Sequence, residues 1–201
     1  MESSASEPLL SVLILTVPRR VSNSFQILVK KLERQSERFA PGVVEIIGVY
    51  DNKTIKLGRK RNLALSMASG RYVTFIDDDD EIDDDYLLEI IRVIRSQRNP
   101  DVIHFPIDQY LHGVKERSCR YGLNLEYSDV DGRWTGKPAH THIWKTELAR
   151  SCEFPPSLNC GEDTPWCVAL SSVAKTEFEI DRVLYRYMLS SKTETRTVVN
   201  L

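Results

Sequence analysis

The sequence lacks several features that would assign it to a special class of protein. None of its apolar runs approaches the roughly 18 residues that a membrane-spanning helix needs. The start of the chain, MESSASEP, has neither the basic region nor the apolar core of a signal peptide. The four cysteines, Cys119, Cys152, Cys160 and Cys167, match no CxxC zinc pattern and are too sparse for a disulfide scaffold. We therefore expect free thiols in a reducing, cytoplasmic compartment.

The composition is that of an ordinary globular protein. With 201 residues, of which 41% are hydrophobic and 28% charged, the chain is long enough for one domain with a substantial core. We expect this domain over 9–190, between a disordered lead-in at 1–8 and a flexible tail at 191–201. The net charge is −2, but eight of the 29 acidic residues lie between positions 77 and 85. The remainder is mildly basic, which suits an anionic ligand and favours a polyanionic acceptor.

The most informative stretch is RYVTFIDDDDEIDDD, from Arg71 to Asp85. Its apolar, β-branched first part predicts a buried strand, which ends at four carboxylates that we call the acidic tetrad: Asp77, Asp78, Asp79 and Asp80. Two like charges ~4 Å apart repel by about 1 kcal/mol even in water. A divalent cation at the carboxyl end of the strand would relieve this repulsion, so we favour a metal site over a solvated acidic helix start.

Strands and helices are predicted to alternate, which indicates an α/β domain with a mostly parallel central sheet. Strands are expected over 9–17, 43–50, 71–76, 101–106, 175–181 and 183–188. Helices are expected over 24–39, 58–69, 83–97 and 163–174, with a loop after the first strand and hairpins over 107–137. The inward-facing side chains of two helices should be Leu63, Met67 and Ala64, and Leu87, Ile90, Ile91 and Ile94.

Charged residues near two strand ends are further candidates. Asp51 ends the strand over 43–50, where it could accept a hydrogen bond from a nucleobase or ribose, or simply close a turn. Arg59, Lys60 and Arg61 crowd the start of a helix, where the helix dipole disfavours cations. This suggests an anion nearby, such as a diphosphate or the acidic tetrad, with a solvated basic face as the alternative.

Three histidines could be either metal ligands or structural residues. His104 lies inside an apolar strand and is expected to be a core residue rather than a ligand. His140 and His142 would point to one face if their segment is a strand, and could then bind a metal together. The favoured alternative is one surface histidine and one hydrogen-bonded histidine.

Three segments together resemble the family 2 glycosyltransferases of the GT-A fold: SVLILTVPRR, GRKRNLALSMASGRYVTFIDDDDEI and GEDTPWCVAL. The likeness is closest to compact viral, phage and bacterial members, which would place the protein in a host cytoplasm if it is viral. The resemblance implies a single GT-A, Rossmann-like domain. It also implies metal-dependent, inverting transfer of a sugar from a nucleoside-diphosphate sugar, with UDP-sugars favoured, to a hydroxyl acceptor. Mn²⁺ or Mg²⁺ would be the cofactor.

The resemblance also implies roles for individual residues. Asp79 would bind the metal, and Asp77 would hold the ribose or a metal-bound water. Asp163 would be the general base, with Glu162 as its neighbour or an acceptor contact. The remaining residues of the implied donor site are Thr16, Pro18, Asp51, Arg61, Asn62 and Asp78.

The chain departs from the family pattern at two places. Only residues 52–58 separate Asp51 from Arg59, where the family has a longer excursion. No histidine follows His142 to complete the metal site, so His140 or His142 could serve. Residues that could instead contact the diphosphate or stack on sugar rings are Arg59, Arg186 and Lys192, and Trp134, Trp144 and Trp166, although the tryptophans could equally be core residues.

Other functions remain as alternatives. A nucleotidyltransferase would share the acidic metal site, but the GED element and the absence of a Gly-rich phosphate loop argue against it. A non-catalytic calcium module of the EF-hand type would need Gly and Glu where the chain has Ile82 and Leu88. A sugar-nucleotide-binding protein without activity is a third alternative. The acceptor, whether glycan, protein, lipid-linked sugar or modified DNA base, and the oligomeric state stay open.

Overall fold

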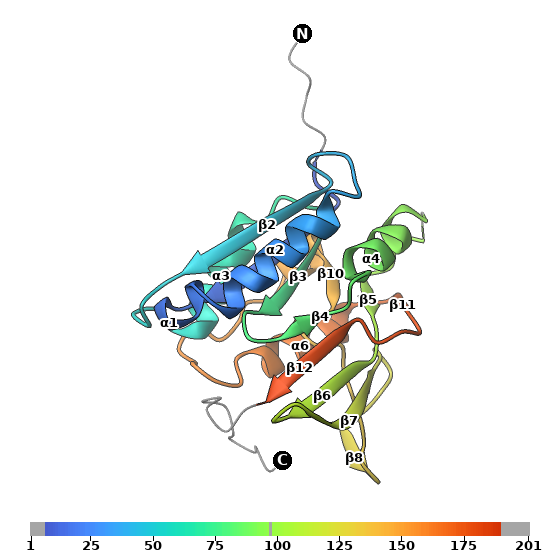
Figure 1. Ribbon diagram of the computed structural model, residues 1–201. Helices are drawn as coiled ribbons and strands as arrows, with labels where there is room; N and C mark the ends of the chain where they lie inside the picture. The colour runs from blue at the N-terminus through green and yellow to red at the C-terminus, as the bar shows by residue number, and fades with distance from the viewer. Residues whose placement is uncertain (1–6, 97, 190–201) are drawn as a thin grey trace.

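The computed structural model describes residues 7–96 and 98–189, which form two six-stranded sheets (Figure 1). Sheet A contains, in spatial order, β11 (Glu177–Glu179), β5 (Val102–His104), β10 (Ile143–Lys145), β3 (Tyr72–Asp77), β1 (Leu10–Thr16) and β2 (Val44–Tyr50). β1 is parallel to β2 and β3, β11 is parallel to β5, and β10 is antiparallel to both its neighbours. The prediction of a mostly parallel central sheet in an α/β fold is confirmed.

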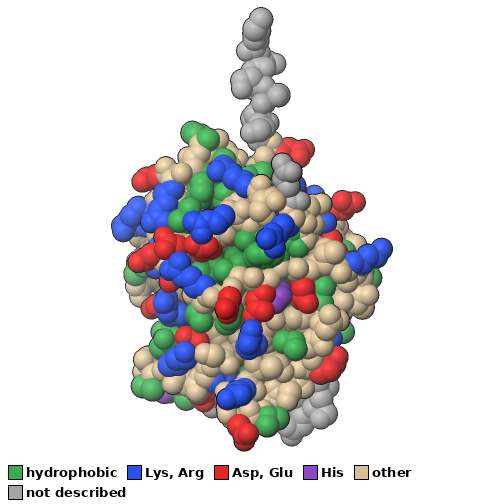
Figure 2. Space-filling view, turned by 90° about the vertical axis from the view of Figure 1, so that its right-hand side faces the viewer, with side chains coloured by type: hydrophobic (Ala, Val, Ile, Leu, Met, Phe, Trp, Pro, Cys, Tyr) green, Lys and Arg blue, Asp and Glu red, His purple; other side chains and the backbone are tan. Residues whose placement is uncertain are grey.

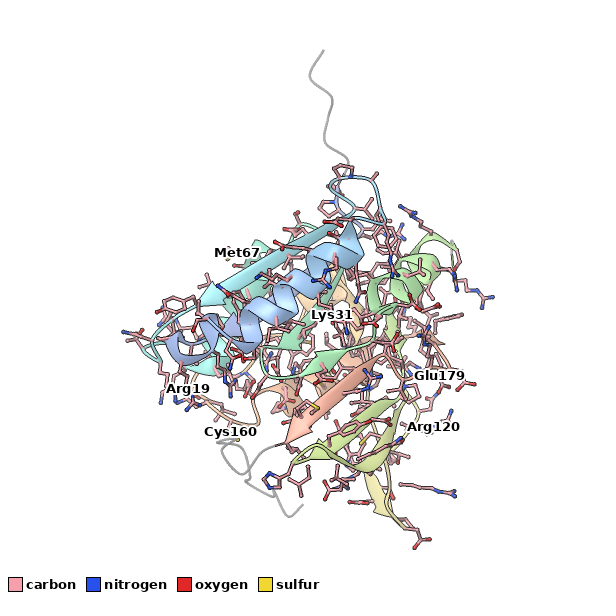
Figure 3. The ribbon with its side chains drawn as sticks, in the orientation of Figure 1. Arg19, Lys31, Met67, Arg120, Cys160 and Glu179 are labelled. Atoms are coloured by element: carbon pink, nitrogen blue, oxygen red, sulfur yellow. The ribbon has the colours of Figure 1, made fainter. Side chains whose placement is uncertain are left out.

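Sheet B is a separate layer at the bottom of Figure 1. It contains, in spatial order, β4 (Glu81–Ile82), β12 (Tyr185–Leu189), β6 (Ile107–Leu111), β7 (Val114–Tyr121), β9 (Arg133–Gly136) and β8 (Ser128–Val130). The hairpin expected over 107–137 is confirmed by the antiparallel pairing of β6 with β7. The closing strands divide between the sheets, because β11 joins sheet A and β12 joins sheet B. An ion pair links the two layers: Nη2 of Arg120 in β7 lies 2.8 Å from Oε1 of Glu179 in β11 (Figure 3).

The central strand β1 is buried along its whole length, and successive side chains point to opposite faces of sheet A. Leu10, Val12 and Ile14 pack with α2 (Ser24–Ser36) and α4 (Tyr86–Arg95). Leu13 and Leu15 pack on the other face with α3 (Leu57–Met67), α5 (Thr146–Ala149) and α6 (Asp163–Val173). Helices therefore cover both faces of the sheet, as its continuous apolar strands require.

Two helices test the predicted inward faces with opposite results. In α4, the predicted residues Leu87, Ile90, Ile91 and Ile94 are all buried. In α3, the prediction is wrong for Leu63 and Met67, which are 45% and 53% exposed, and right for Ala64. The helix instead buries Lys60, Arg61 and Leu65, because the two cations pair with buried carboxylates. The ion pairs set the orientation of α3.

Other local expectations are corrected by the structure. Residues after β1 form a short helix, α1 (Pro18–Val21), instead of a loop, with proline at its favoured first position. His140 and His142 lie in a turn and not in a strand. The four cysteines are free, and His104 is buried as predicted. In the described ranges no helix is long and apolar enough to cross a membrane. Of the expected lead-in and tail, residues 1–6 and 191–201 lie outside the described residues.

Gly58 allows α3 to dock closely on the loop that precedes α6. A Cβ at this position would collide with the carbonyl of Pro155, so Gly58→Ala should destabilise the protein by about 1–3 kcal/mol. In a chain of this size each kcal/mol lowers the melting temperature by about 2–4 °C, which thermal denaturation measures. The control is Ser66→Ala on the exposed side of the same helix, expected to change stability by less than about 0.5 kcal/mol. Equal melting temperatures for both variants would contradict the docking argument.

Candidate functional site

A cavity of about 500 Å³ opens where the carboxyl ends of β1 and β3 in sheet A face β6 and β12 of sheet B. We call it the site cavity. Its lining includes all four members of the acidic tetrad, Thr16, Arg61, His140, Glu162 and Asp163. Figure 3 labels two further lining residues at the lower left, Arg19 of α1 and Cys160 from the segment before α6. Ligands of open α/β sheets bind at this carboxyl edge, so the cavity is the candidate active site.

Two members of the acidic tetrad are committed to internal contacts. Asp78 accepts hydrogen bonds from the hydroxyl of Thr16 and from Nη1 of Arg20, both at 2.6 Å. Asp80 accepts one from the hydroxyl of Tyr185 at 2.6 Å and one from the backbone N–H of Met188 at 2.7 Å. Both carboxylates are buried. Asp78 therefore fixes α1 to the end of β3, and Asp80 fixes β12 of sheet B to the same turn.

The other two members keep about a quarter of their side chains exposed, 27% for Asp77 and 29% for Asp79. Nη2 of Arg61 lies 3.2 Å from Asp77, and Nη2 of Arg20 lies 2.8 Å from Asp79. Burial alone would raise the pKa of Asp77, but Arg61 and His140 hold it well below its usual range. The pKa of Asp79 is raised by burial, with further contributions from Asp77 and Asp78. These two carboxylates remain available to a ligand or an ion in the site cavity.

Arg61 connects the acidic tetrad to the start of α6. Its Nε donates a hydrogen bond of 2.7 Å to Glu162, which is buried, and its Nη2 donates to Asp77. The guanidinium also lies 5.1 Å from the ring centre of Phe75. Its third nitrogen, Nη1, is buried and has no hydrogen-bond partner within the described residues. Because an unpaired buried donor is costly, a ligand oxygen in the cavity would stabilise it.

His140 lies between two carboxylates on opposite sides of its ring. Nδ1 is 3.1 Å from Asp163, and Nε2 is 3.5 Å from Asp77. Burial and Arg61 oppose the charged ring, yet the two carboxylates raise the pKa of His140 to about 9. Burial would raise the pKa of Asp163, but His140 lowers it to about 2. Asp163 is thus ionised at neutral pH and lies beside a charged histidine, so its carboxylate is in the form that can accept a proton.

The structure does not bring every predicted donor-site residue to the cavity. Asp51 pairs with Lys60 and accepts a hydrogen bond of 2.9 Å from the backbone N–H of Ile55, so it closes a turn. Asn62 exchanges two hydrogen bonds of 2.9 Å with the backbone of Phe154. Neither side chain lines the cavity, nor do Pro18 and Arg59, which are exposed.

The remaining predicted contacts are also placed elsewhere. Arg186 points toward Asp83, 3.7 Å away, and Lys192 lies outside the described residues. His142 is buried and holds the backbone of Phe105 and Ala139, so it does not share a face with His140. Trp144 and Trp166 are core residues, and Trp166 stacks on Phe154. Trp134 is half-buried in sheet B beside Tyr121, at a ring distance of 5.1 Å.

Sequence reasoning missed three residues that shape the cavity: Arg20, Tyr185 and Tyr187. Arg20 was visible as one of two cations directly after a buried strand, where the predicted sheet places the acidic tetrad. Tyr185 and Tyr187 alternate within the predicted strand over 183–188, so they share one face. The residues near this strand do not indicate which of the two sheets it joins.

A bound metal would need donors from more than the protein. Within residues 7–96 and 98–189, no three His, Cys, Asp or Glu side chains are grouped to hold an ion. Mg²⁺, however, is commonly bound by one or two carboxylates together with substrate phosphates. Asp77 and Asp79, with hard oxygen donors exposed to one cavity, fit that arrangement.

The chain is similar in sequence to one known protein family. The model of the family described as glycosyl transferase family 2 matches residues 28–144, more than half of the chain. The match contains the acidic tetrad and Arg61 but leaves out Asp163. No protein with a curated function matches the chain in sequence.

Among solved structures, the chain is similar to a 1–349 fragment of TarS from S. aureus. The TarS complex with UDP matches with a TM-score of 0.67 and 20% identity, over 90% of this chain and 60% of the TarS chain. The complex with UDP-GlcNAc matches with a TM-score of 0.62 and 17% identity, over 90% and 58% of the two chains. The chain thus spans about 60% of the length of these TarS chains. At such low identity the likeness shows a common fold.

Measurements of protein stability can separate the internally bonded members of the acidic tetrad from the members that face the cavity. Asp80→Ala should lower the free energy of unfolding by about 2–4 kcal/mol, because Tyr185 and the backbone N–H of Met188 lose a buried acceptor. Asp79→Ala removes a partly exposed ion pair with Arg20 and should cost less than about 1 kcal/mol. Urea denaturation of both variants measures the difference. Similar losses in the two variants would show that the tetrad is not divided in this way.

Proposed function

Since the chain belongs to glycosyl transferase family 2 and has the GT-A fold, we propose that it transfers a sugar from a nucleoside-diphosphate sugar to a hydroxyl group of an acceptor. The observation that carries the proposal is the site cavity, where an ionised carboxylate of α6 faces two carboxylates at the end of β3. A UDP-sugar is the favoured donor, because the similar TarS structures are complexes with UDP and UDP-GlcNAc.

The donor diphosphate would bind on the sheet A side of the cavity. The lysines and arginines that line the cavity all come from this side: Arg19, Arg20, Lys53, Lys60 and Arg61. Nη1 of Arg61 is buried there without a partner in the described residues, so it can donate to a phosphate oxygen. Asp77 and Asp79 would hold Mn²⁺ or Mg²⁺ together with the phosphates. When bound, the ion supplies a Lewis acid for the leaving diphosphate.

Asp163 is the proposed general base. Its carboxylate accepts the proton of the acceptor hydroxyl while that oxygen bonds to the anomeric carbon of the donor sugar. The bond between the anomeric carbon and the diphosphate oxygen breaks, and direct displacement inverts the anomeric configuration. His140, 3.1 Å from Asp163, keeps the carboxylate in position and ionised. Glu162 does not take part in proton transfer in this proposal, because it is buried against Arg61.

Calorimetric titration tests the donor class first. UDP or a UDP-sugar should bind at least tenfold more tightly with Mn²⁺ than without it, whereas GDP and GDP-sugars should bind more weakly. Asp79→Ala should abolish the effect of Mn²⁺, because one of the two exposed carboxylates is lost. Asp84→Ala is the matched control, since Asp84 belongs to the same acidic run but is solvent-exposed and pairs with Lys31. Absence of nucleotide binding in every condition would overturn the proposed function.

Asp163→Asn tests catalysis separately from binding. The amide has nearly the shape of the carboxylate but cannot accept the proton, so the turnover of donor sugar should fall about 10²–10⁴-fold. The dissociation constant for UDP should change by less than about twofold, because Asp163 is not among the cations and carboxylates proposed to hold the diphosphate and its metal ion. Release of UDP is the assay. Unchanged turnover would contradict the role of Asp163, and no turnover in the parent protein despite UDP binding would favour a binding module.

A further inference from the structure

The sheet B side of the site cavity is built differently from the sheet A side. Gln109 of β6 and Tyr187 of β12 are directly paired in the parallel register of the two strands, and both line the cavity. Neighbouring strands lie about 4.8 Å apart, so the two side chains stand next to each other on one face of sheet B. Tyr121 of β7 also lines this side, and its ring packs on Trp134 of β9.

The polar groups of this pair are free to bind a ligand. Within the described residues, neither the amide of Gln109 nor the hydroxyl of Tyr187 makes a hydrogen bond. Tyr185, on the same strand, is by contrast committed to Asp80. An amide and a phenol side by side offer both donors and acceptors, and the neighbouring rings offer an apolar surface. These are the groups that bind the hydroxyls and the ring face of a sugar.

Charge distinguishes this side from the donor side. All the lysines and arginines that line the cavity belong to sheet A elements and the segments that follow them, and the lining residues of sheet B are uncharged. The pKa of Tyr187 is raised, first by burial and then by the negative charges of Asp77, Asp80 and Asp163. Sheet B therefore supplies no cation from the cavity lining to pair with a phosphate or a carboxylate, and carboxylates lie near Tyr187.

Four of the five basic residues of sheet B pair with carboxylates, and the fifth, Arg133, is exposed. Lys115 pairs with Asp108, Arg117 with Asp129 and Arg120 with Glu179. On the face drawn in Figure 2, acidic and basic side chains lie next to one another, so this face offers no broad basic surface to a polyanion. The polyanionic acceptor suggested by the composition stays a prediction that the charges of this face do not favour.

We propose that Gln109, Tyr121 and Tyr187, together called the acceptor wall, bind an uncharged saccharide whose hydroxyl receives the transferred sugar. The proposal rests on the proposed glycosyl transfer and adds the class of acceptor. Gln109 and Tyr187 hydrogen bond to hydroxyls of the saccharide, while Tyr121 supports its ring. The site cavity thereby joins an anionic donor bound by sheet A to a neutral acceptor bound by sheet B.

The test measures retention of the full-length protein on an array of oligosaccharides, with and without saturating UDP and Mn²⁺. The array contains neutral gluco-, galacto- and manno-oligosaccharides, phosphorylated and sulfated forms of them, and a single-stranded DNA oligonucleotide. Neutral saccharides should be retained in preference to all anionic probes. Gln109→Ala and Tyr187→Phe should each weaken the retention about fivefold, as expected for one lost hydrogen bond, with the affinity for UDP unchanged within twofold.

The control is Tyr110→Phe, next to Gln109 on β6 but not part of the cavity lining, which should leave the retention unchanged. Preferential binding of phosphorylated probes or of DNA would overturn the proposal, as would failure to retain any neutral saccharide. An equal loss of UDP affinity in the Gln109 and Tyr187 variants would also overturn it, because the wall would then belong to the donor site. Failure of the proposed function appears separately, as saccharide binding without any binding of UDP.

Discussion

The buried ion pairs of Arg61 are the interaction on which the site depends. One guanidinium on α3 pairs with Asp77 at the end of β3 and with Glu162 at the start of α6. Removing one partner of a buried charge is strongly destabilising, so these three elements keep a fixed arrangement. The same constraint explains why α3 exposes Leu63 and Met67. Burial of the charged side chains Lys60 and Arg61 leaves Leu63 and Met67 on the outside. Here the requirements of a site override the usual apolar pattern of a helix.

The acidic tetrad shows how a run of like charges is accommodated in a fold. Two carboxylates become structural, because Asp78 holds Thr16 and Arg20 and Asp80 holds Tyr185. The other two face the cavity and are each compensated by a nearby arginine or histidine. This division keeps the charges in place without complete neutralisation. Asp77 and Asp79 are thereby left in the lining of the cavity, beside Arg20 and Arg61.

Much of this fold could be predicted from sequence because its signals are local. Continuous apolar strands, the inward face of α4 and the position of the acidic tetrad all follow from neighbouring residues. What could not be predicted depends on contacts between distant parts of the chain. Asp80 and Tyr185 are 105 positions apart, and Arg61 and Glu162 are 101 apart. The hydrogen bonds of Asn62 with Phe154 likewise depend on how α3 docks, which no periodicity in the sequence describes.

The contacts of Asp80 also join the two sides of the cavity. Its carboxylate accepts hydrogen bonds from the Tyr185 hydroxyl and the backbone of Met188, so the turn that carries Asp77 and Asp79 is attached directly to β12. Tyr187 lies between these two anchored residues and is held in place with them. The separation between the donor-side carboxylates and the acceptor wall is therefore set by one short turn. A ligand that moved this turn would move Tyr187 as well, so in the proposed reaction the geometry of donor binding and that of acceptor binding would depend on each other.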